Sequence, residues 1–420
     1  MARWITLAEA ARQLGVRAQT VYAYASRGRI TVMPDPRDPR KSLYRAEDIS
    51  GLSRSKQVGR KRETLAAGTI FGAEPCIYTA ITAISKGRLY YRGHDTIRLS
   101  ESAGLEDVAR ILWGAEADIS FDTADMPFEG LPSGRTRAFV SLSDLAVRGN
   151  STMGRIDRAL HAEAGGLVGL VAKAFGAVAT RPGEAIHLQL ARGWGQGAEV
   201  AERLRQAMVL LADHELTSSA FSTRITASTG ASLAACLLTG LTTFSGPLHG
   251  DASGRVRALL DDVQQRGAER VAAHHLRSAI AIPGFGHHLY PDGDPRAQAL
   301  MANVSPPAEI ATFVERVVAL TGLQPNIDFA LATMATRFDL PADAAFALFA
   351  VARCTGLLAH GMEQLRVGMV IRPRARYVGP TLEDRKEAPV SGELDDPGRP
   401  SSDTLARNQI FRRRDVDPAA

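Results

Sequence analysis

The side chains best suited to chemistry lie in four short segments that also contain glycine or proline or flank an apolar run. The four segments are ADHELTSS around His214, SGPLHGDAS around His249, PGFGHHLYPDGDPRA around His287 and PNIDFALATM around Asp328. Such segments are typical of loops that hold functional groups at a cleft. Histidine and the carboxylates are the side chains that enzymes use most for proton transfer. The four segments therefore indicate general acid–base chemistry, provided that the fold brings them together.

Three arginines accompany these segments. Arg296 ends the His287 segment, Arg353 lies inside the apolar stretch FAVARCTG, and Arg372 lies in IRPRARY. A guanidinium group can bind a carboxylate through two parallel hydrogen bonds. The arginines therefore favour a substrate that carries carboxylates.

Each of these residues also has a structural interpretation. A single histidine in a turn is more often structural than catalytic, and Asp328 could be the N-cap of the helix that follows it. Arg353 could pair with a structural carboxylate. His287 and His288 are neighbours that point in different directions, and the histidine spacings match neither H-x-x-x-H nor H-E-x-x-H. A metal site is therefore not predicted.

Apolar residues at helical spacing dominate the chain from about residue 65 onward. Examples are LEDVARILWG, ERLRQAMVLLADHEL, ASLAACLLTGLTTF and AAFALFAVARCTGLLAHGMEQL. Alternating strand patterns are nearly limited to GTIFGAEPCIYTAIT and GRLYYRG. The pattern predicts a mainly helical enzyme body that positions the site. The stretch from about residue 380, rich in proline, glycine and charge, is predicted to be a tail.

The composition is that of an ordinary globular protein. The chain has 420 residues, of which 45% are hydrophobic and 23% charged, and this length predicts two or three domains. No apolar run approaches the ~20 residues that cross a bilayer, and the N-terminus does not read as a signal peptide. We therefore expect a cytoplasmic protein without a membrane partner. Cys76, Cys236 and Cys354 are expected to be reduced and mostly buried.

The N-terminal residues form a basic head. Residues 1–62 contain 14 Lys or Arg against 5 Asp or Glu, a balance of +9 in a chain of net charge +5. Thr6 and Glu9 form a capping box that begins a helix. The segment TLAEAARQLGVRAQTVYAYASRGRI resembles the helix-turn-helix of excisionase- and MerR-like domains, with TVMPDPRDPRKSLYRAEDI as its wing. A small helical module for protein contacts remains the alternative.

The helix-turn-helix resemblance implies DNA as a partner, because its second helix would enter a groove. The residues that this helix would present are Arg17, Gln19, Thr20 and Tyr22.

Seven segments resemble, in the same order, the motifs of citrate synthases. They are TAISKGRLYYRGHD, ADHEL, GPLHG, GFGHHLYPDGDPRA, PNIDF, FAVARCTGLLAHGMEQ and IRPRARYVG, which together span roughly residues 65–380. The resemblance implies a mainly α fold, a two-domain helical enzyme with a cleft, and a homodimer. The predicted parts are a winged helix-turn-helix module at 1–52, a basic linker at 53–64, a large helical domain at 65–255 completed by about 360–385, a small helical domain at 256–359, and a tail at 386–420.

The same resemblance implies an acyltransferase that condenses acetyl-CoA with oxaloacetate to citrate and CoA, with no metal or cofactor. By resemblance, Asp328 removes a proton from the acyl-CoA methyl group, and His249 donates a hydrogen bond to the developing enolate oxygen. His287 resembles the acid that polarises and protonates the carbonyl of the oxo acid. The residues that resemble ligands of the oxo acid are His214, Arg296, Arg353 and, supplied by the partner subunit, Arg372.

The sequence departs from the family pattern at several positions near these motifs. GDAS follows His249 where GGAN is common, so Asp251 places a negative charge near the expected enolate. Thr217 stands where many members have Asn, and His288 where Arg is usual. Two alternatives therefore stay open. One is a 2-methylcitrate synthase that uses propionyl-CoA, since one methylene changes binding by only ~1–3 kcal/mol. The other is a metabolite-sensing DNA-binding protein with a weakly active synthase body.

Overall fold

The computed structural model describes residues 4–14, 21, 25, 30–36, 38–50, 77–123, 130–132, 134–277 and 281–373. The chain divides into two compact units. The first, called here the N-terminal unit, comprises residues 1–76 with 372–420, and the second, called the main unit, comprises residues 77–371.

The N-terminal unit contains a small antiparallel sheet and a capped helix. Strand β3 (Asp38–Arg45) pairs with both β1 (Trp4–Thr6) and β2 (Val32–Asp35), so it is the central strand. Helix α1 (Leu7–Leu14) begins with the predicted capping box, in which Thr6 N donates to the Glu9 carboxylate at 2.9 Å and Glu9 N donates to Thr6 Oγ1 at 3.3 Å. The unit has its own apolar core, made of Ile5, Ala10, Leu14, Val21, Ile30, Tyr44 and Ile49.

The β2–β3 hairpin lies where the wing was predicted. The residues predicted to contact DNA, Arg17, Gln19, Thr20 and Tyr22, lie outside the described residues, as do the linker and the tail.

The main unit opens with a three-stranded antiparallel sheet. Its order is β4 (Thr82–Ser85), β5 (Arg88–Tyr91) and β6 (His94–Asp95). Lys86 and Gly87 join β4 to β5 with φ angles of 50° and 69°, which is the backbone geometry that suits a two-residue hairpin turn. Strand β5 lies inside the predicted segment GRLYYRG, whereas β4 shares only Thr82 with the predicted segment GTIFGAEPCIYTAIT and β6 lies outside both.

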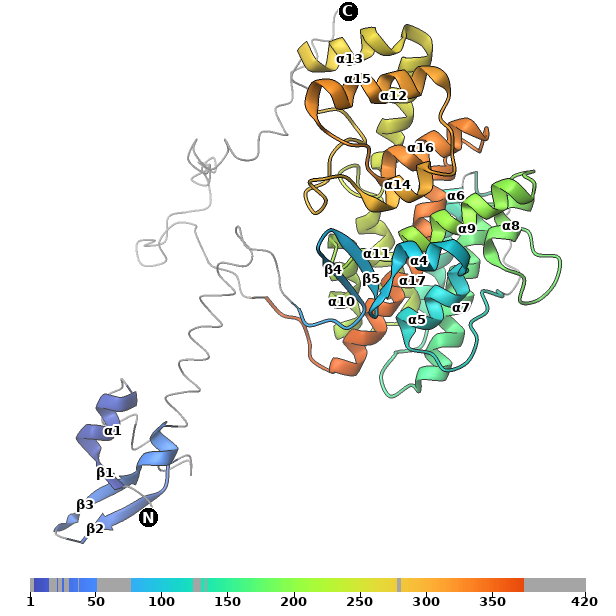
Figure 1. Ribbon diagram of the computed structural model, residues 1–420. Coiled ribbons are helices and arrows are strands. Elements are labelled where there is room, and N and C mark those ends of the chain that lie inside the picture. The colour runs from blue at the N-terminus through green and yellow to red at the C-terminus, as the bar shows by residue number, and fades with distance from the viewer. Residues whose placement is uncertain are drawn as a thin grey trace, which may run out of the picture. The chain divides into compact units, whose positions relative to one another are not determined.

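Helices joined by loops form the remainder of the described main unit, which confirms the mainly helical prediction (Figure 1). They are α4 (Thr96–Ser102), α5 (Leu105–Trp113), α6 (Gly134–Arg148), α7 (Asp157–Ala174), α8 (Ile186–Gly193), α9 (Ala198–Leu211), α10 (Ser218–Ser228), α11 (Leu233–Phe244), α12 (Ala252–Arg266), α13 (Ala268–Arg277), α14 (Pro295–Met301), α15 (Ala308–Thr321), α16 (Ile327–Arg337) and α17 (Ala344–Val367).

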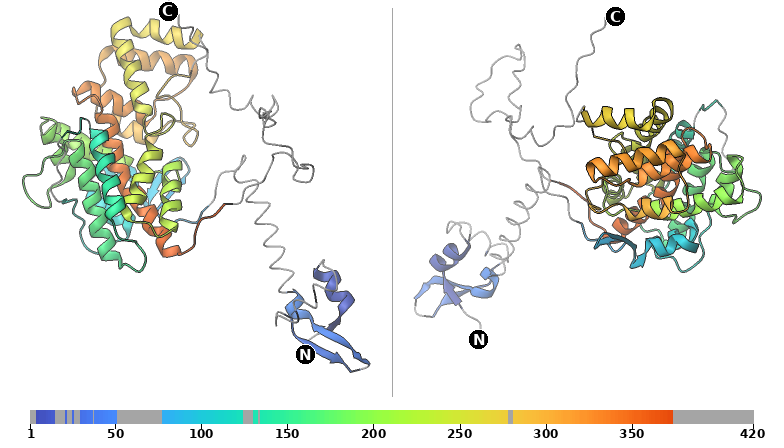
Figure 2. Two further views of the ribbon diagram at one scale, coloured as in Figure 1. Left: turned by 180° about the vertical axis from the view of Figure 1, so that it is seen from behind. Right: turned by 45° about the horizontal axis from the view of Figure 1, so that its top comes forward.

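Helix α17 is the central helix of the main unit. It packs against α5, α7, α9, α10 and α11, and Figure 2 shows it running among the surrounding helices. Every residue from Ala344 to Met362 is buried. Of the described helices it alone is long and apolar enough to cross a bilayer, but its surface is covered by protein, which is the environment of a core helix.

Two apolar clusters fill the main unit. The second cluster is formed by α12, α13, α15 and part of α16, which lie together in Figure 1. Helix α16 joins both clusters, since Ile327 and Leu331 pack into the first while Phe329 and Ala332 pack into the second. The predicted division into domains at residues 65–255 and 256–359 stays a prediction.

Candidate active site

His214 lies in a tight turn that follows α9. Glu215 adopts a left-handed conformation with φ of 60°, which reverses the direction of the chain. The turn approaches α17 at Gly356, where an added Cβ would collide with Asp213 Oδ1. His214 is buried, and its Nε2 lies 2.9 Å from the hydroxyl of Tyr290. Burial and the nearby arginines lower the pKa of His214 well below its usual value, so the ring is neutral at pH 7.

His287 lies on a glycine-rich loop between α13 and α14. Gly286 has a φ of 74°, which favours glycine. The His287 ring stacks on His288 with 5.0 Å between centroids and lies 5.3 Å from the ring of His214. Leu289 N donates to Nδ1 of His287 at 3.2 Å, and burial lowers the pKa of His287 to about 4. The hydrogen bond therefore assigns a neutral ring with its proton on Nε2.

His249 lies in the turn between α11 and α12. Its Nε2 lies 2.8 Å from Ser219 Oγ, and its ring centroid is 5.3 Å from that of Phe244. A side chain at Gly250 would collide with the Phe244 ring, so glycine is needed for this close turn. Burial, with a contribution from Arg353, lowers the pKa of His249 to about 4. His249 is therefore a neutral imidazole that can donate or accept one hydrogen bond.

Asp328 lies in the first turn of α16 but does not cap it. The N-cap is Asn326, whose side chain accepts from Asp328 N at 3.1 Å and Phe329 N at 3.3 Å. The N-cap interpretation of Asp328 is therefore wrong. Asp328 Oδ1 is buried without a hydrogen-bond partner among the described residues. Burial, reinforced by the carboxylate of Asp294, raises the pKa of Asp328 to about 6.

Arg296 is held by a carboxylate that also contacts α16. Its Nε and Nη2 donate to the two oxygens of Asp294 at 3.0 and 2.8 Å. Asp294 Oδ2 also accepts from Ile327 N at 3.1 Å. Burial would raise the pKa of Asp294, but Arg296 outweighs it and lowers the pKa below its usual value. Asp294 therefore ties Arg296 to the start of the helix that carries Asp328.

Arg353 presents an unsatisfied hydrogen-bond donor in the interior. Its Nε donates to Leu211 O at 3.0 Å, and its guanidinium lies 4.9 Å from the ring centroid of Phe349. Arg353 is 1% exposed, and its Nη2 is buried with no hydrogen-bond partner in the described part of the chain. An unpartnered buried cation is costly, so this atom suits a bound anion.

Ring contacts and a cation–π contact connect part of the site, and electrostatic interactions with Arg353 connect the rest. His214 contacts His287, and Tyr290 lies between His214 and Arg296, 5.4 Å from the Arg296 guanidinium. The charge of Arg353 also shifts the pKa values of His214, His249 and Asp328. The structure therefore brings together three histidines, one carboxylate and two arginines from five different segments of the sequence.

The unusual Asp251 is compensated by a partner distant in the sequence. Arg135 Nη2 donates to Asp251 Oδ1 at 2.5 Å, and the Arg135 guanidinium lies 3.7 Å from the ring centroid of Phe346. The negative charge beside His249 is therefore paired. Thr217, the second departure, is the N-cap of α10 and accepts from Ala220 N.

Arg372 is exposed and belongs to the N-terminal unit, so nothing places it at this site. Sequence reasoning missed two residues that contact the predicted ones. Tyr290 and Asp294 both lie in the segment PGFGHHLYPDGDPRA. The sequence D-P-R could have pointed to Asp294, because Asp is a favoured N-cap residue and proline is favoured at the first position of a helix.

The described residues contain no group of three or more His, Cys, Asp or Glu that could hold a metal ion. Cys236 and Cys354 are free and buried, as predicted, while Cys76 lies outside the described residues. Burial raises the pKa of Cys236 to about 12 and also raises that of Cys354. Neither of these two thiols is therefore a nucleophile near neutral pH.

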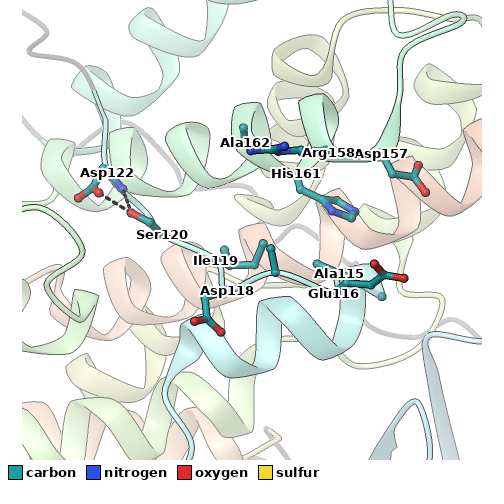
Figure 3. Close-up of a pocket in the computed structure, with 12 residues that line it drawn as sticks. Ala115, Glu116, Asp118, Ile119, Ser120, Asp122, Asp157, Arg158, His161 and Ala162 are labelled. Carbon is teal, nitrogen blue, oxygen red and sulfur yellow. Dashed lines mark hydrogen bonds between the residues drawn. The ribbon is translucent and has the colours of Figure 1, made fainter.

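A cavity of about 660 Å³ lies elsewhere, between α5, the segment after it and α7 (Figure 3). Its carboxylates include Asp122, which accepts from Ser120 Oγ and Gly183 N, and Asp157, which pairs with Arg366 at 3.1 Å. Asp122 and Asp157 therefore already have partners within the protein.

The fold and the site define a mainly helical enzyme body in which histidines, an aspartate and arginines converge. Residues 156–374, a little over half of the chain, match the family model "Citrate synthase, C-terminal domain". The chain therefore belongs to the citrate synthase family.

Individual relatives agree with this assignment. Citrate synthase of Haloferax volcanii is 36% identical over 192 residues, which cover 43% of this chain and 51% of the relative. The chain thus spans about half the length of such relatives. 2-Methylcitrate synthase 1 of Corynebacterium glutamicum is 27% identical over 75% of this chain and 95% of its own. The citrate synthase of Thermoplasma acidophilum, solved with carboxymethyl coenzyme A and oxaloacetate, has the same fold with a TM-score of 0.63, 20% identity and coverage of 76% and 97%.

Proposed function

We propose that this chain condenses acetyl-CoA with oxaloacetate to give citrate and CoA. The observation that carries the proposal is the Asp328 carboxylate, which has a raised pKa and lies within the field of Arg296 and Arg353. Its Oδ1 is buried and has no hydrogen-bond partner among the described residues. A base with a pKa near 6 is still ionised at pH 7 but is more basic than an ordinary aspartate. Relatives named citrate synthase support the choice of reaction.

Proton removal is the first step of the proposed mechanism. The Asp328 carboxylate takes a proton from the methyl group of acetyl-CoA, and the thioester oxygen becomes an enolate. A neutral His249 donates a hydrogen bond to this oxygen. A donor already aimed at the developing charge stabilises it without reorganisation.

Carbon–carbon bond formation is the second step. The enolate carbon attacks the oxo carbon of oxaloacetate, and the carbonyl oxygen takes the proton that His287 holds on Nε2. Water then hydrolyses the thioester and releases CoA. The acyl thioester and the oxo acid supply all of the reacting bonds, so the proposed reaction requires no cofactor.

The oxo acid is a dianion, and its binding requires fixed cations. Arg353 offers Nη2, which has no partner among the described residues, and Arg296 is already oriented by Asp294. His214 is the third proposed ligand. We assign Arg372 to the site of a partner subunit, by resemblance alone.

A homodimer is part of this proposal. The α6 face and the turn after it expose apolar side chains, with Val147 86%, Met153 75% and Ile156 70% exposed. Contact with a second copy would remove this apolar surface from water. Sedimentation equilibrium should give twice the mass of the chain, and a monomer at micromolar concentration would contradict this part. A cytoplasmic location, expected from the sequence, also belongs to the proposal.

The decisive experiment measures thiol release from acetyl-CoA with and without oxaloacetate. Release that depends on oxaloacetate is expected, and no release would contradict the proposal. Propionyl-CoA is the second arm, because the Corynebacterium relative named 2-methylcitrate synthase covers most of this chain. If kcat/KM were much higher for propionyl-CoA than for acetyl-CoA, propionyl-CoA would be assigned as the substrate instead.

We also propose that the N-terminal unit binds DNA, which makes a metabolite-linked regulator the second candidate. The net charge of +9 over residues 1–62 supports it, as do the capped helix α1 and the following hairpin. Phosphate-driven affinity is greatest at low salt. Binding to duplex DNA should therefore weaken steeply as salt rises, and no binding at low salt would contradict this proposal.

A further inference from the structure

A second group of charged side chains is buried behind the proposed site. Arg224 on α10 is fully buried and forms an ion pair with Glu363 on α17. Glu363 also accepts from Ala80 N at 2.8 Å, while Arg224 Nη2 donates to Thr79 Oγ1 at 3.1 Å. Desolvation offsets most of the gain from a buried ion pair. Stability alone is therefore a weak reason for these charges.

His360 connects this ion pair to the turn of His214. Arg224 Nε donates to His360 Nδ1 at 3.0 Å. Because a guanidinium group only donates, Nδ1 must be unprotonated, and the ring proton is assigned to Nε2. Nε2 faces Asp213 Oδ1 at 3.4 Å, an ion-pair distance without the alignment of a hydrogen bond. The arginine thus fixes which histidine nitrogen points a proton at Asp213.

Asp213 is held from three directions. Its Oδ2 accepts from Thr82 Oγ1 at 2.5 Å, and its backbone N and O each lie 3.2 Å from the hydroxyl of Tyr91. Gly356 leaves the space on α17 that the Asp213 side chain occupies. Burial opposes ionisation of Asp213, but His360, Arg353 and Thr82 outweigh it and lower its pKa. Asp213 is therefore an immobilised anion.

The turn that Asp213 fixes carries two contacts of the site. The carbonyl of Leu211 accepts from Arg353 Nε at 3.0 Å, and His214 directly follows Asp213. A shift of this turn would displace both proposed ligands of the oxo acid. It would leave Asp328 and His249 in place, because they lie on other segments.

We propose that Asp213 and His360 are positioning residues that hold Arg353 and His214 in place for the oxo acid. The inference rests on the proposed function for the identity of that acid. It assigns no proton transfer to either residue, so their effect acts through binding of one substrate.

The test compares His360→Leu with His360→Gln in the full-length protein. Leucine removes both ring contacts, whereas the glutamine amide offers one donor toward Asp213 and one acceptor toward Arg224. In His360→Leu, KM for oxaloacetate should rise roughly 10- to 100-fold, as expected for a displacement of about 1 Å, while KM for acetyl-CoA stays within about twofold. His360→Gln should recover most of the loss. Thr355→Val, which removes a buried hydroxyl from the same helix, is the control and should change neither KM.

Equal changes in both KM values would overturn the proposal, as would a glutamine variant no better than leucine. If His360→Leu folds poorly, ¹⁵N NMR of the wild-type histidines tests the same point, with the His360 signal assigned from its loss in His360→Gln. The ring proton should reside on Nε2, and a proton on Nδ1 would contradict the assignment. Calorimetric titration with oxaloacetate alone separates the two proposals. Wild-type binding without thiol release would reject the proposed reaction, while the affinities of the variants would still decide the role of His360.

Discussion

Asp328 combines properties that a structural carboxylate does not need. One of its oxygens is buried without a hydrogen bond among the described residues, and its pKa is raised to about 6. A neutral amide of the same shape would avoid the cost of burying the charge, but it cannot accept a proton from the substrate. Asp328→Asn should therefore lower kcat by about 10²- to 10⁴-fold while the affinity for oxaloacetate stays nearly unchanged. Near-normal turnover would refute the assignment of the base.

The same residue predicts a specific dependence on pH. Activity should fall as the pH drops through about 6, because the base becomes protonated. The free energy of unfolding should change in the opposite direction from activity as the pH rises. A carboxyl with a raised pKa binds its proton more tightly in the folded state, so folding is favoured at low pH and loses stability as the pH rises to about 6. Above that pH, Asp328→Asn should raise the free energy of unfolding in urea by roughly 1–2 kcal/mol. The gain is limited to this size because the side chain is only half-buried. The prediction would be contradicted if the difference in free energy of unfolding between Asp328→Asn and the wild type were the same at pH 4.5 and 7.5.

Arg353 provides the matching prediction for the oxo acid. Arg353→Leu should weaken oxaloacetate binding by about 100-fold or roughly 3 kcal/mol, because a buried carboxylate loses its partner. Calorimetric titration measures this directly. Arg158→Leu, which removes an exposed arginine beside the other cavity, is the control and should leave the affinity unchanged. Unchanged affinity in Arg353→Leu would remove this residue from the site.

At the scale of single elements, the start of α16 holds the base in place. Asn326 caps the helix, and its Nδ2 also donates to Gly286 O at 3.1 Å on the His287 loop. Asn326→Ala should cost about 1 kcal/mol of stability and should also lower kcat. Ser232→Ala, which removes the N-cap of α11, is the matched control. It should lose similar stability in urea unfolding and keep its activity. Equal kcat in the two variants would show that the cap has no functional role.

The elements also show what the sequence could and could not predict. Helical spacing of apolar residues predicted the helical body, because each helix buries one face or is wholly buried. The strand pattern of GRLYYRG and the capping box of Thr6 and Glu9 are local in sequence, so both could be predicted. The sequence also offers Asn326 as a cap residue two positions before Asp328, and the structure uses Asn326.

The contacts that sequence reasoning missed join residues far apart in the chain. Arg135 and Asp251 are 116 residues apart, and Arg224 and His360 are 136 residues apart. No local pattern links such pairs, and each depends on how whole helices pack. Tertiary structure was therefore needed to show that Asp251 is neutralised and that Asp213 is held in place.

At the scale of the whole molecule, the two units have separate apolar cores. A segment with its own core can fold by itself. Removal of residues 1–76 should therefore leave oxaloacetate-dependent thiol release within about twofold of the intact protein and should abolish DNA binding. Circular dichroism checks that the shortened protein is folded. A folded but inactive product would show that the N-terminal unit contributes to the reaction.

Helix α16 has one more consequence, which concerns heat. The two faces of α16 belong to different apolar clusters. Unfolding of either cluster would therefore disrupt this helix and with it the other cluster. Differential scanning calorimetry of residues 77–420 should thus show a single cooperative endotherm. Irreversible inactivation on heating should begin within that endotherm and not before it.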